Sequence, residues 1–181
     1  MKKELTKKVI DFFNIEAALN AVSNAPGFKF QVILALNQKV IKETLDVIKE
    51  KAKNTPEFEE ITKLADEIKK RYAKKDKDGN PIIIADNMNG RLVHKYDISD
   101  ESLKKFEKEL EKFWKEEKNN KIKEDQEKIF KDYEEYVTKE MLTVTLITFP
   151  ESAIPNEYFS KPENAEQLHY FTNACLDLFE E

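Results

Sequence analysis

Large apolar residues recur at steps of three and four along the first 53 residues, which is the spacing of an amphipathic helix. Residues 5–22 predict one or two short helices, and Ala25-Pro26-Gly27 then interrupts the pattern. Residues 28–53 predict a longer helix. Its apolar stripe consists of Phe30, Ile33, Leu34, Ile41, Leu45, Ile48 and Ala52.

Thr55-Pro56-Glu57 predicts the start of the next helix. Threonine accepts a hydrogen bond from a free N–H at the N-cap, proline is tolerated at the first helical position, and an acid suits the positive end of the helix. The apolar face of this helix is Phe58, Ile61, Leu64, Ala65, Ile68 and Tyr72. Because only a turn at Asn54 separates it from the helix of 28–53, the two helices are expected to form an antiparallel hairpin.

Short β-branched segments follow. Asp76-Lys77-Asp78-Gly79-Asn80-Pro81 ends the helical pattern, and residues 82–85 predict a strand. Asn and Gly at 87–90 tolerate the positive φ of a tight turn, and residues 91–98 alternate as a return strand. The segment 80–97 is therefore predicted to form a β-hairpin.

Ser99-Asp100-Glu101 predicts the start of the longest helix, which spans 99–138 and carries Leu103, Phe106, Leu110, Phe113 and Trp114 on a heptad-like seam. Between residues 115 and 128 Ile122 is the only large apolar residue. Two structures fit this gap: one continuous or kinked helix, or a turn between two helices at Asn119-Asn120. The continuous or kinked helix is favoured.

Residues 142–148 are rich in β-branched side chains and Pro150 follows them, so they predict a strand. A lone hairpin is marginally stable, and this strand is expected to join it in a three-stranded antiparallel sheet. Asn164-Ala165-Glu166-Gln167 resembles a capping box before the last helix. The predicted fold is α+β and mainly α, with one core shared by Ile33, Ile41, Leu64, Phe106, Leu110 and Phe113.

Composition predicts one domain over residues 1–181. Its parts are a helical region 1–75, the hairpin 80–97, the long helix 99–138, and a strand and C-terminal helix in 141–180. Charged residues make up 37% of the chain, against roughly 25% in an ordinary globular protein, which favours long solvated helices. The net charge of −5 arises from interleaved signs, so a nucleic-acid partner is not expected. No apolar run approaches the roughly 20 residues that cross a bilayer, and the predicted location is cytoplasmic.

Candidate catalytic and metal-binding groups are few. His94 and His169 are 75 residues apart and neither belongs to a spaced metal motif. Cys175 lies on the apolar face of the last helix, where a free cysteine packs as a small hydrophobe. The segment 76–84 lacks the spacing of a calcium loop. The sequence therefore predicts no catalytic residue, no metal, no cofactor and no enzyme, although a deep pocket at His94 or His169 would favour one.

The order of elements resembles a family of uncharacterised small proteins of tailed bacteriophages. The resemblance is carried by KKRYAKKDKDGNPIII, by YDISDESLKKFEKELEKFWKEE, and by TVTLITFPESAIP before a short last helix, and it covers about residues 28–180. The segment 86–90 and the loop 151–163 depart from the family pattern. The resemblance implies a phage origin and action inside an infected bacterium, and it transfers no functional residues.

Three function classes remain open. The favoured one is a non-enzymatic accessory factor that binds a host or phage protein, either as an assembly chaperone or as an inhibitor of a host enzyme or defence system. The alternative is a structural virion component of capsid or tail, and an unrecognised enzyme comes third. Aromatic side chains often dominate interfaces, so Trp114, Tyr133 and Tyr136 are the candidate partner-binding residues. A homo-oligomer is compatible with either of the first two classes.

Overall fold

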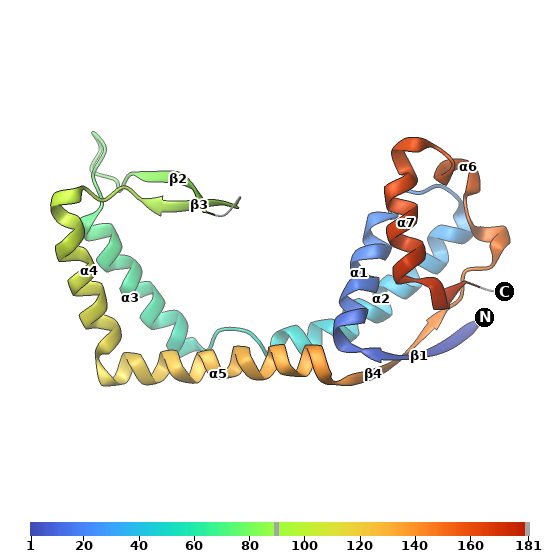
Figure 1. Cartoon of the computed structure of the whole chain (residues 1–181), viewed down its shortest axis with the longest axis horizontal. Coiled ribbons are helices and arrows are strands. Elements are labelled where there is room, and N and C mark those ends of the chain that lie inside the picture. Colours follow the sequence, from blue (N-terminus) through green and yellow to red (C-terminus); the bar gives the residue numbers. More distant parts are fainter. Residues whose placement is uncertain (89–90, 180–181) are drawn as a thin grey trace. The chain divides into compact units, whose positions relative to one another are not determined.

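The computed structural model describes residues 1–88 and 91–179 (Figure 1). Contacts divide the chain into two compact units. Unit 1 comprises Met1–Lys53 and the described residues from Ile129 onward, and unit 2 comprises Asn54–Lys128. Helices dominate both, and the strands are short and antiparallel, so the predicted mainly helical α+β class is confirmed. None of the described helices is long and apolar enough to span a membrane.

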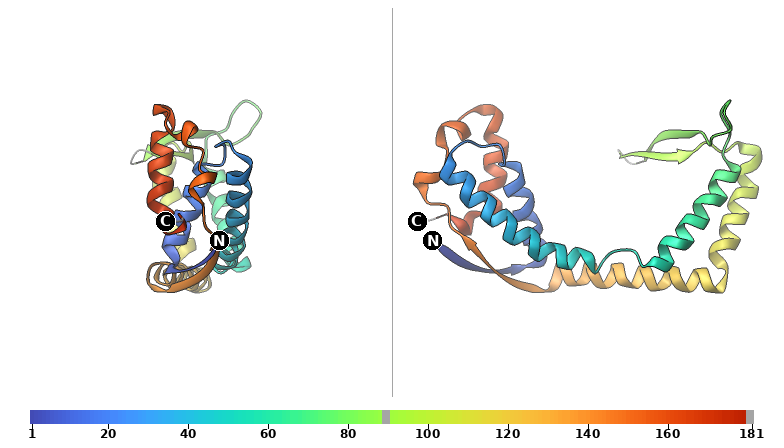
Figure 2. Two further views of the ribbon diagram at one scale, coloured as in Figure 1. Left: turned by 90° about the vertical axis from the view of Figure 1, so that its right-hand side faces the viewer. Right: turned by 180° about the vertical axis from the view of Figure 1, so that it is seen from behind.

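Unit 1 contains a two-stranded sheet formed by segments from opposite ends of the chain. β1 (Lys2–Lys8) pairs antiparallel with β4 (Met141–Ile147), with Leu5 opposite Val144, and the strands run side by side in Figures 1 and 2. The prediction of a helix beginning at Leu5 is therefore wrong for residues 5–8. The segment has one large apolar residue, too few to define a helical period, and its partner strand lies more than 130 residues away.

The predicted three-stranded sheet is also wrong. β2 (Ile83–Met88) and β3 (Arg91–Tyr96) form the predicted hairpin in unit 2, whereas β4 pairs with β1 in unit 1. One edge of β4 is hydrogen-bonded to β1. At its other edge the Asn37 side chain bonds both backbone groups of Ile147, so that position is closed to a further strand.

Helices pack around this sheet. They are α1 (Val9–Ala21), α2 (Phe28–Glu50) and α7 (Ala165–Ala174), with the short α6 (Asn156–Phe159) and three 3-10 turns between Glu151 and Leu178. Their core is aromatic: the ring of Phe30 lies 5.3 Å from that of Phe149 and 5.8 Å from that of Phe171. All three side chains are fully buried. Such edge-on and tilted ring pairs add to the stabilisation that burial provides.

Unit 2 is built on two antiparallel helices, α3 (Pro56–Tyr72) and α4 (Asp100–Lys115), with the hairpin between them in sequence (Figure 2). The predicted hairpin of 28–53 with 56–72 is not formed within either unit: α2 packs on α1 and β4, and α3 packs on α4. The predicted start of α3 is confirmed, because the Thr55 hydroxyl accepts a hydrogen bond from the Phe58 N–H at 3.2 Å.

The predicted long helix is two helices. α4 ends at Lys115, Glu116 is extended (φ −58°, ψ 130°), and α5 (Glu117–Lys139) follows. The favoured continuous or kinked helix is therefore wrong, and the break between the two helices lies at Glu116 rather than at Asn119-Asn120. Asn119 is buried, and its amide nitrogen donates to the Phe113 carbonyl at 2.9 Å, which satisfies one of the free carbonyls at the end of α4.

The predicted common core is wrong as well. Ile33 and Ile41 are buried in unit 1, whereas the other four residues belong to unit 2. Leu64 is 50% exposed, and α4 contributes no fully buried residue. The apolar seam of α4 packs on the single neighbouring helix α3, and one helix covers less of a side chain than the several elements around α2 do.

Candidate docking groove

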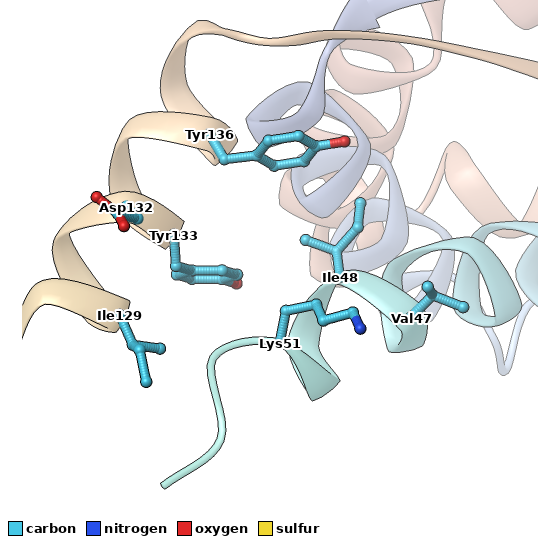
Figure 3. A pocket seen from close by; sticks show the side chains of 7 residues that line it. All are labelled: Val47, Ile48, Lys51, Ile129, Asp132, Tyr133 and Tyr136. Carbon is cyan, nitrogen blue, oxygen red and sulfur yellow. The ribbon is translucent and has the colours of Figure 1, made fainter. Parts of the chain in front are cut away.

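An apolar groove lies in unit 1 between the C-terminal ends of α2 and α5 (Figure 3). It encloses about 520 Å³ and is lined by Val47, Ile48, Lys51, Ile129, Asp132, Tyr133 and Tyr136. The lining is mostly aliphatic and aromatic, with one cation and one anion. A hollow of this size and composition is typical of binding sites.

Helical spacing explains how the two helices present these side chains. Ile129, Tyr133 and Tyr136 are separated by four and three residues, so they share one face of α5. Val47 on α2 and Lys51 at its C-cap are four residues apart, beside the buried stripe that contains Leu45. Figure 3 shows both tyrosines pointing from α5 toward α2.

The groove is fixed to the core on its inner side and open on its outer side. Val137 is buried in the core next to Tyr136, and Tyr133 and Ile48 pack against that core. Tyr136 is nevertheless 44% exposed and Val47 65% exposed. Large apolar surface held open to water in this way raises the free energy of the isolated protein, and an occupant that covered it would recover that energy.

Lys51 and Asp132 set the polar character of the groove. They lie on opposite walls, and the side chain of neither forms an ion pair or hydrogen bond with another described residue. By contrast, the nearby Lys49 ammonium lies 3.0 Å from the Glu16 carboxylate. The groove therefore offers one unpaired charge of each sign to whatever binds beside its apolar floor.

Two of the three aromatic residues singled out by the sequence come together here. Tyr133 and Tyr136 line the groove, while Trp114 is half-buried in unit 2, where its ring meets that of Phe113 edge-on at 5.1 Å. The sequence reasoning missed the α2 wall. The sequence feature that could have identified this wall is Val47, a large apolar residue at a position that the helical period assigns to solvent.

Unit 2 contains a second hollow, of about 530 Å³, that includes His94. Three carboxylates line it. Asp66 accepts from the Tyr96 hydroxyl at 3.2 Å and lies 3.0 Å from the Lys70 ammonium, Asp97 lies 2.9 Å from the Lys74 ammonium, and Asp100 is in the first turn of α4. Burial and the bond to Asp66 raise the pKa of Tyr96 above its usual 10. No serine, threonine or cysteine is among the described residues that line it.

The other residues considered for chemistry belong to unit 1. His169 lies on α7, with its ring Nε2 3.0 Å from the Asn173 amide nitrogen, whereas His94 belongs to unit 2. Cys175 is buried, as predicted, and burial raises the pKa of its thiol to about 12. Among the described residues no three His, Cys, Asp or Glu side chains are grouped to hold a metal ion.

Residues 76–80, in the segment that lacks the spacing of a calcium loop, form a turn held by the Asp76 side chain. Its carboxylate accepts from the N–H groups of Asp78 at 2.9 Å and Asn80 at 2.8 Å, and the Asn80 bond in particular lowers the Asp76 pKa. Gly79 has φ +83°, a conformation that side chains with a Cβ rarely adopt. Turn chemistry accounts for these residues.

Comparison with known proteins adds no relative: no family model, no curated protein and no solved structure matches this chain.

Proposed function

We propose that this protein acts by binding another protein, and that the groove between α2 and α5 is where the partner docks. The observation that carries the proposal is the open apolar groove in which Tyr136 and Val47 stay exposed although the core lies directly beneath. An exposed apolar patch rimmed by polar residues is one mark of an interaction site.

The partner element that suits the groove is an amphipathic helix. Two helices already form the walls, and a third can lay its apolar face between them. Tyr133 and Tyr136 supply large rigid contact area with a polar tip, which is why tyrosine is common among residues that dominate binding energy. Lys51 and Asp132 would pair with charges that flank the apolar face of the partner.

The biological setting follows the resemblance described above and is part of the proposal. The protein would be a phage-encoded accessory factor in the infected bacterium, either an assembly chaperone or an inhibitor of a host enzyme or defence system. A structural virion component is the alternative. The two differ in where the protein is found: a virion component remains with purified particles, and an accessory factor remains in the cell lysate.

The test is affinity capture from infected host cells with the full chain and two variants. Val47→Asp places a charge on an exposed wall of the groove, and Leu64→Asp places the same charge on an exposed leucine of unit 2. We expect one or more proteins to be captured by the parent and by Leu64→Asp, and to be lost with Val47→Asp. Equal capture by all three chains would exclude the groove as the docking site.

A further inference from the structure

One edge of the small sheet in unit 1 is open. β1 pairs with β4 on one side, and no described strand pairs with it on the other. The pairing is regular from Lys2 to Lys8, without a bulge, and no proline interrupts the strand. Proteins commonly block further pairing at an edge strand by making it short, by a bulge or by a proline, and β1 has none of these features.

The hydrogen bonds at the two ends of the sheet show which backbone groups of β1 face the open edge. The Thr148 N–H donates to the Met1 carbonyl at 2.8 Å, and the Val9 N–H donates to the Glu140 carbonyl at 3.1 Å. In an antiparallel pair every second residue makes such bonds, so the odd-numbered residues of β1 direct their backbone groups toward β4. The even-numbered residues direct theirs to the open edge, where no described residue bonds to them. These groups are the N–H and C=O of Lys2, Glu4 and Thr6 and the N–H of Lys8.

The side chains along this edge are mainly positive. Lys2 and Lys8 are exposed, one at each end of β1, and neither ammonium forms an ion pair with a described residue. Glu4 is the only acid of the strand, whereas the charge of Lys7 is balanced by Asp177, whose carboxylate lies 2.5 Å from its ammonium. Opposite charges on neighbouring strands attract and like charges repel, so the edge favours a strand with acids at both ends.

The same charges disfavour a second copy of β1 in that place. Full-length antiparallel pairing of two β1 strands would set Lys2 opposite Lys8 of the other copy at both ends of the pair. A register that places Glu4 opposite Lys8 removes this repulsion, but it pairs only residues 4–8. The lysines therefore select against self-pairing and leave the edge available to an acidic strand.

We propose that the open edge of β1 docks an extended, acidic segment of another protein, which joins the sheet as a third, antiparallel strand. Strand addition to a free edge is a recurrent mode of peptide recognition, in which backbone hydrogen bonds provide affinity and side chains provide specificity. Antiparallel pairing is the more stable arrangement per residue. Cross-strand pairing then defines the segment: acids opposite Lys2 and Lys8, a base opposite Glu4, and a β-branched residue opposite Thr6.

The open edge is separate from the groove of the proposed function, because no residue of β1 lines that groove. The two sites also take different elements, an extended strand at β1 and an amphipathic helix between α2 and α5. Each can therefore fail or succeed without the other.

The experiment measures binding of a fluorescent seven-residue peptide to the full chain, with one peptide residue for each residue of β1. The peptide has glutamate at both ends, lysine opposite Glu4, and threonine or valine elsewhere. We expect saturable binding by fluorescence anisotropy with a dissociation constant of about 1 mM or lower. Amide hydrogen exchange should slow at Glu4 and Thr6, and should change little at Leu5, whose backbone is already bonded to β4.

Two N-methylated peptides separate strand addition from simple attraction between charges. Methyl groups on the peptide nitrogens opposite Glu4 and Thr6 block the hydrogen bonds to β1 and should abolish binding. The matched control has methyl groups on the nitrogens opposite Lys3 and Leu5. Those nitrogens point away from β1, so this peptide should still bind.

A charge exchange tests which segment the edge selects. Lys2→Glu and Lys8→Glu in one chain should weaken binding of the glutamate-ended peptide by about tenfold, and this variant should instead bind a peptide with lysine at both ends. Both positions are exposed, and an acid at position 8 suits the N-terminus of α1, so the variant should fold. Val47→Asp, on the groove wall, should bind the original peptide as the parent does.

Three results would overturn the proposed strand addition. One is the absence of peptide binding at about 1 mM. Another is equal binding of the two methylated peptides, because the lysines would then attract any anion without a strand being formed. The third is loss of peptide binding in Val47→Asp, which would place the peptide in the groove. Failure of the proposed function is distinct from all three: the peptide binds as expected, and Val47→Asp captures the same proteins from infected cells as the parent.

Discussion

Asn37 binds both backbone groups of Ile147. Its amide nitrogen donates to the Ile147 carbonyl at 2.8 Å, and its amide oxygen accepts from the Ile147 N–H at 2.7 Å. A strand neighbour would make the same two bonds. One side chain of α2 therefore satisfies the free edge of β4 at this residue and ties that strand to the helix, although the two residues are 110 positions apart in sequence.

Replacing Asn37 should destabilise unit 1 strongly. Asn37→Leu keeps the volume of this buried side chain similar but leaves the N–H and C=O of the half-buried Ile147 without partners, which should cost about 2 to 4 kcal/mol. Urea unfolding followed by circular dichroism measures the loss. The matched control is Asn173→Leu, an exposed asparagine of α7, which should change stability by less than about 0.5 kcal/mol. Equal effects of the two variants would contradict this account of Asn37.

Unit 2 should respond to acid through Glu109. This carboxylate on α4 accepts from the Tyr72 hydroxyl at 2.6 Å and from the Arg71 guanidinium at 2.5 Å, so it joins α4 to the end of α3. The Tyr72 bond first, and then Arg71, lower the Glu109 pKa below its usual 4.5. A lowered folded-state pKa stabilises the fold above pH 4.5 and loses that contribution as pH falls through the lowered value.

The prediction is an acid transition below pH 4.5 in the fluorescence of Trp114, the only tryptophan of the chain, which lies on α4. Glu109→Gln should reduce that transition and bring the raised pKa of Tyr72 back toward 10. Glu111 is the control. Its pKa is lowered by Lys115 on the same helix, so Glu111→Gln leaves the contact between helices intact. A transition unchanged by Glu109→Gln would show that another group is responsible.

The two predicted helix caps should differ in strength. The Thr55 hydroxyl accepts from the Phe58 N–H, whereas Ser99, also placed at an N-cap by the sequence, makes no such bond. Thr55→Ala should therefore destabilise unit 2 by about 1 kcal/mol, and Ser99→Ala by clearly less. Thermal unfolding monitored by Trp114 fluorescence compares the two. The interpretation fails if Ser99→Ala is the more damaging change.

The sequence predicted those features that local rules determine. The start of α3 follows from Thr55-Pro56, the turn at 76–81 from the hydrogen-bonding capacity of Asp76 and the freedom of Gly79, and the burial of Cys175 from its place on an apolar stripe. In each case the deciding partners lie within a few residues. Local patterns are sufficient for such features.

Features that depend on distant partners were missed. β1 is a strand because β4 pairs with it. β4 does not pair with the β2–β3 hairpin, because β1 occupies one of its edges and Asn37 is bonded at the other. Nothing within residues 2–8 signals that partner. For the groove, aromatic character identified Tyr133 and Tyr136 as candidates, but only folding shows that Val47 lies opposite them. Which residues face each other across a site is determined by tertiary packing, and a local sequence pattern does not contain it.

Cys175 should behave as a buried thiol that reacts only when unit 1 opens. Thiolate is the reactive form, and a pKa of about 12 makes it roughly a thousandfold scarcer at neutral pH than for a thiol with the usual pKa of 9. Burial also keeps reagent away, since the side chain lies in the core. We expect a disulfide reagent at pH 8 to label the folded chain very slowly and the urea-unfolded chain at once. Asn37→Leu, which destabilises the same unit, should speed labelling of the folded chain. Thr55→Ala, in unit 2, is the control and should leave the labelling rate unchanged. Rapid labelling of the folded parent would mean that Cys175 is accessible and that the packing described around α7 is wrong.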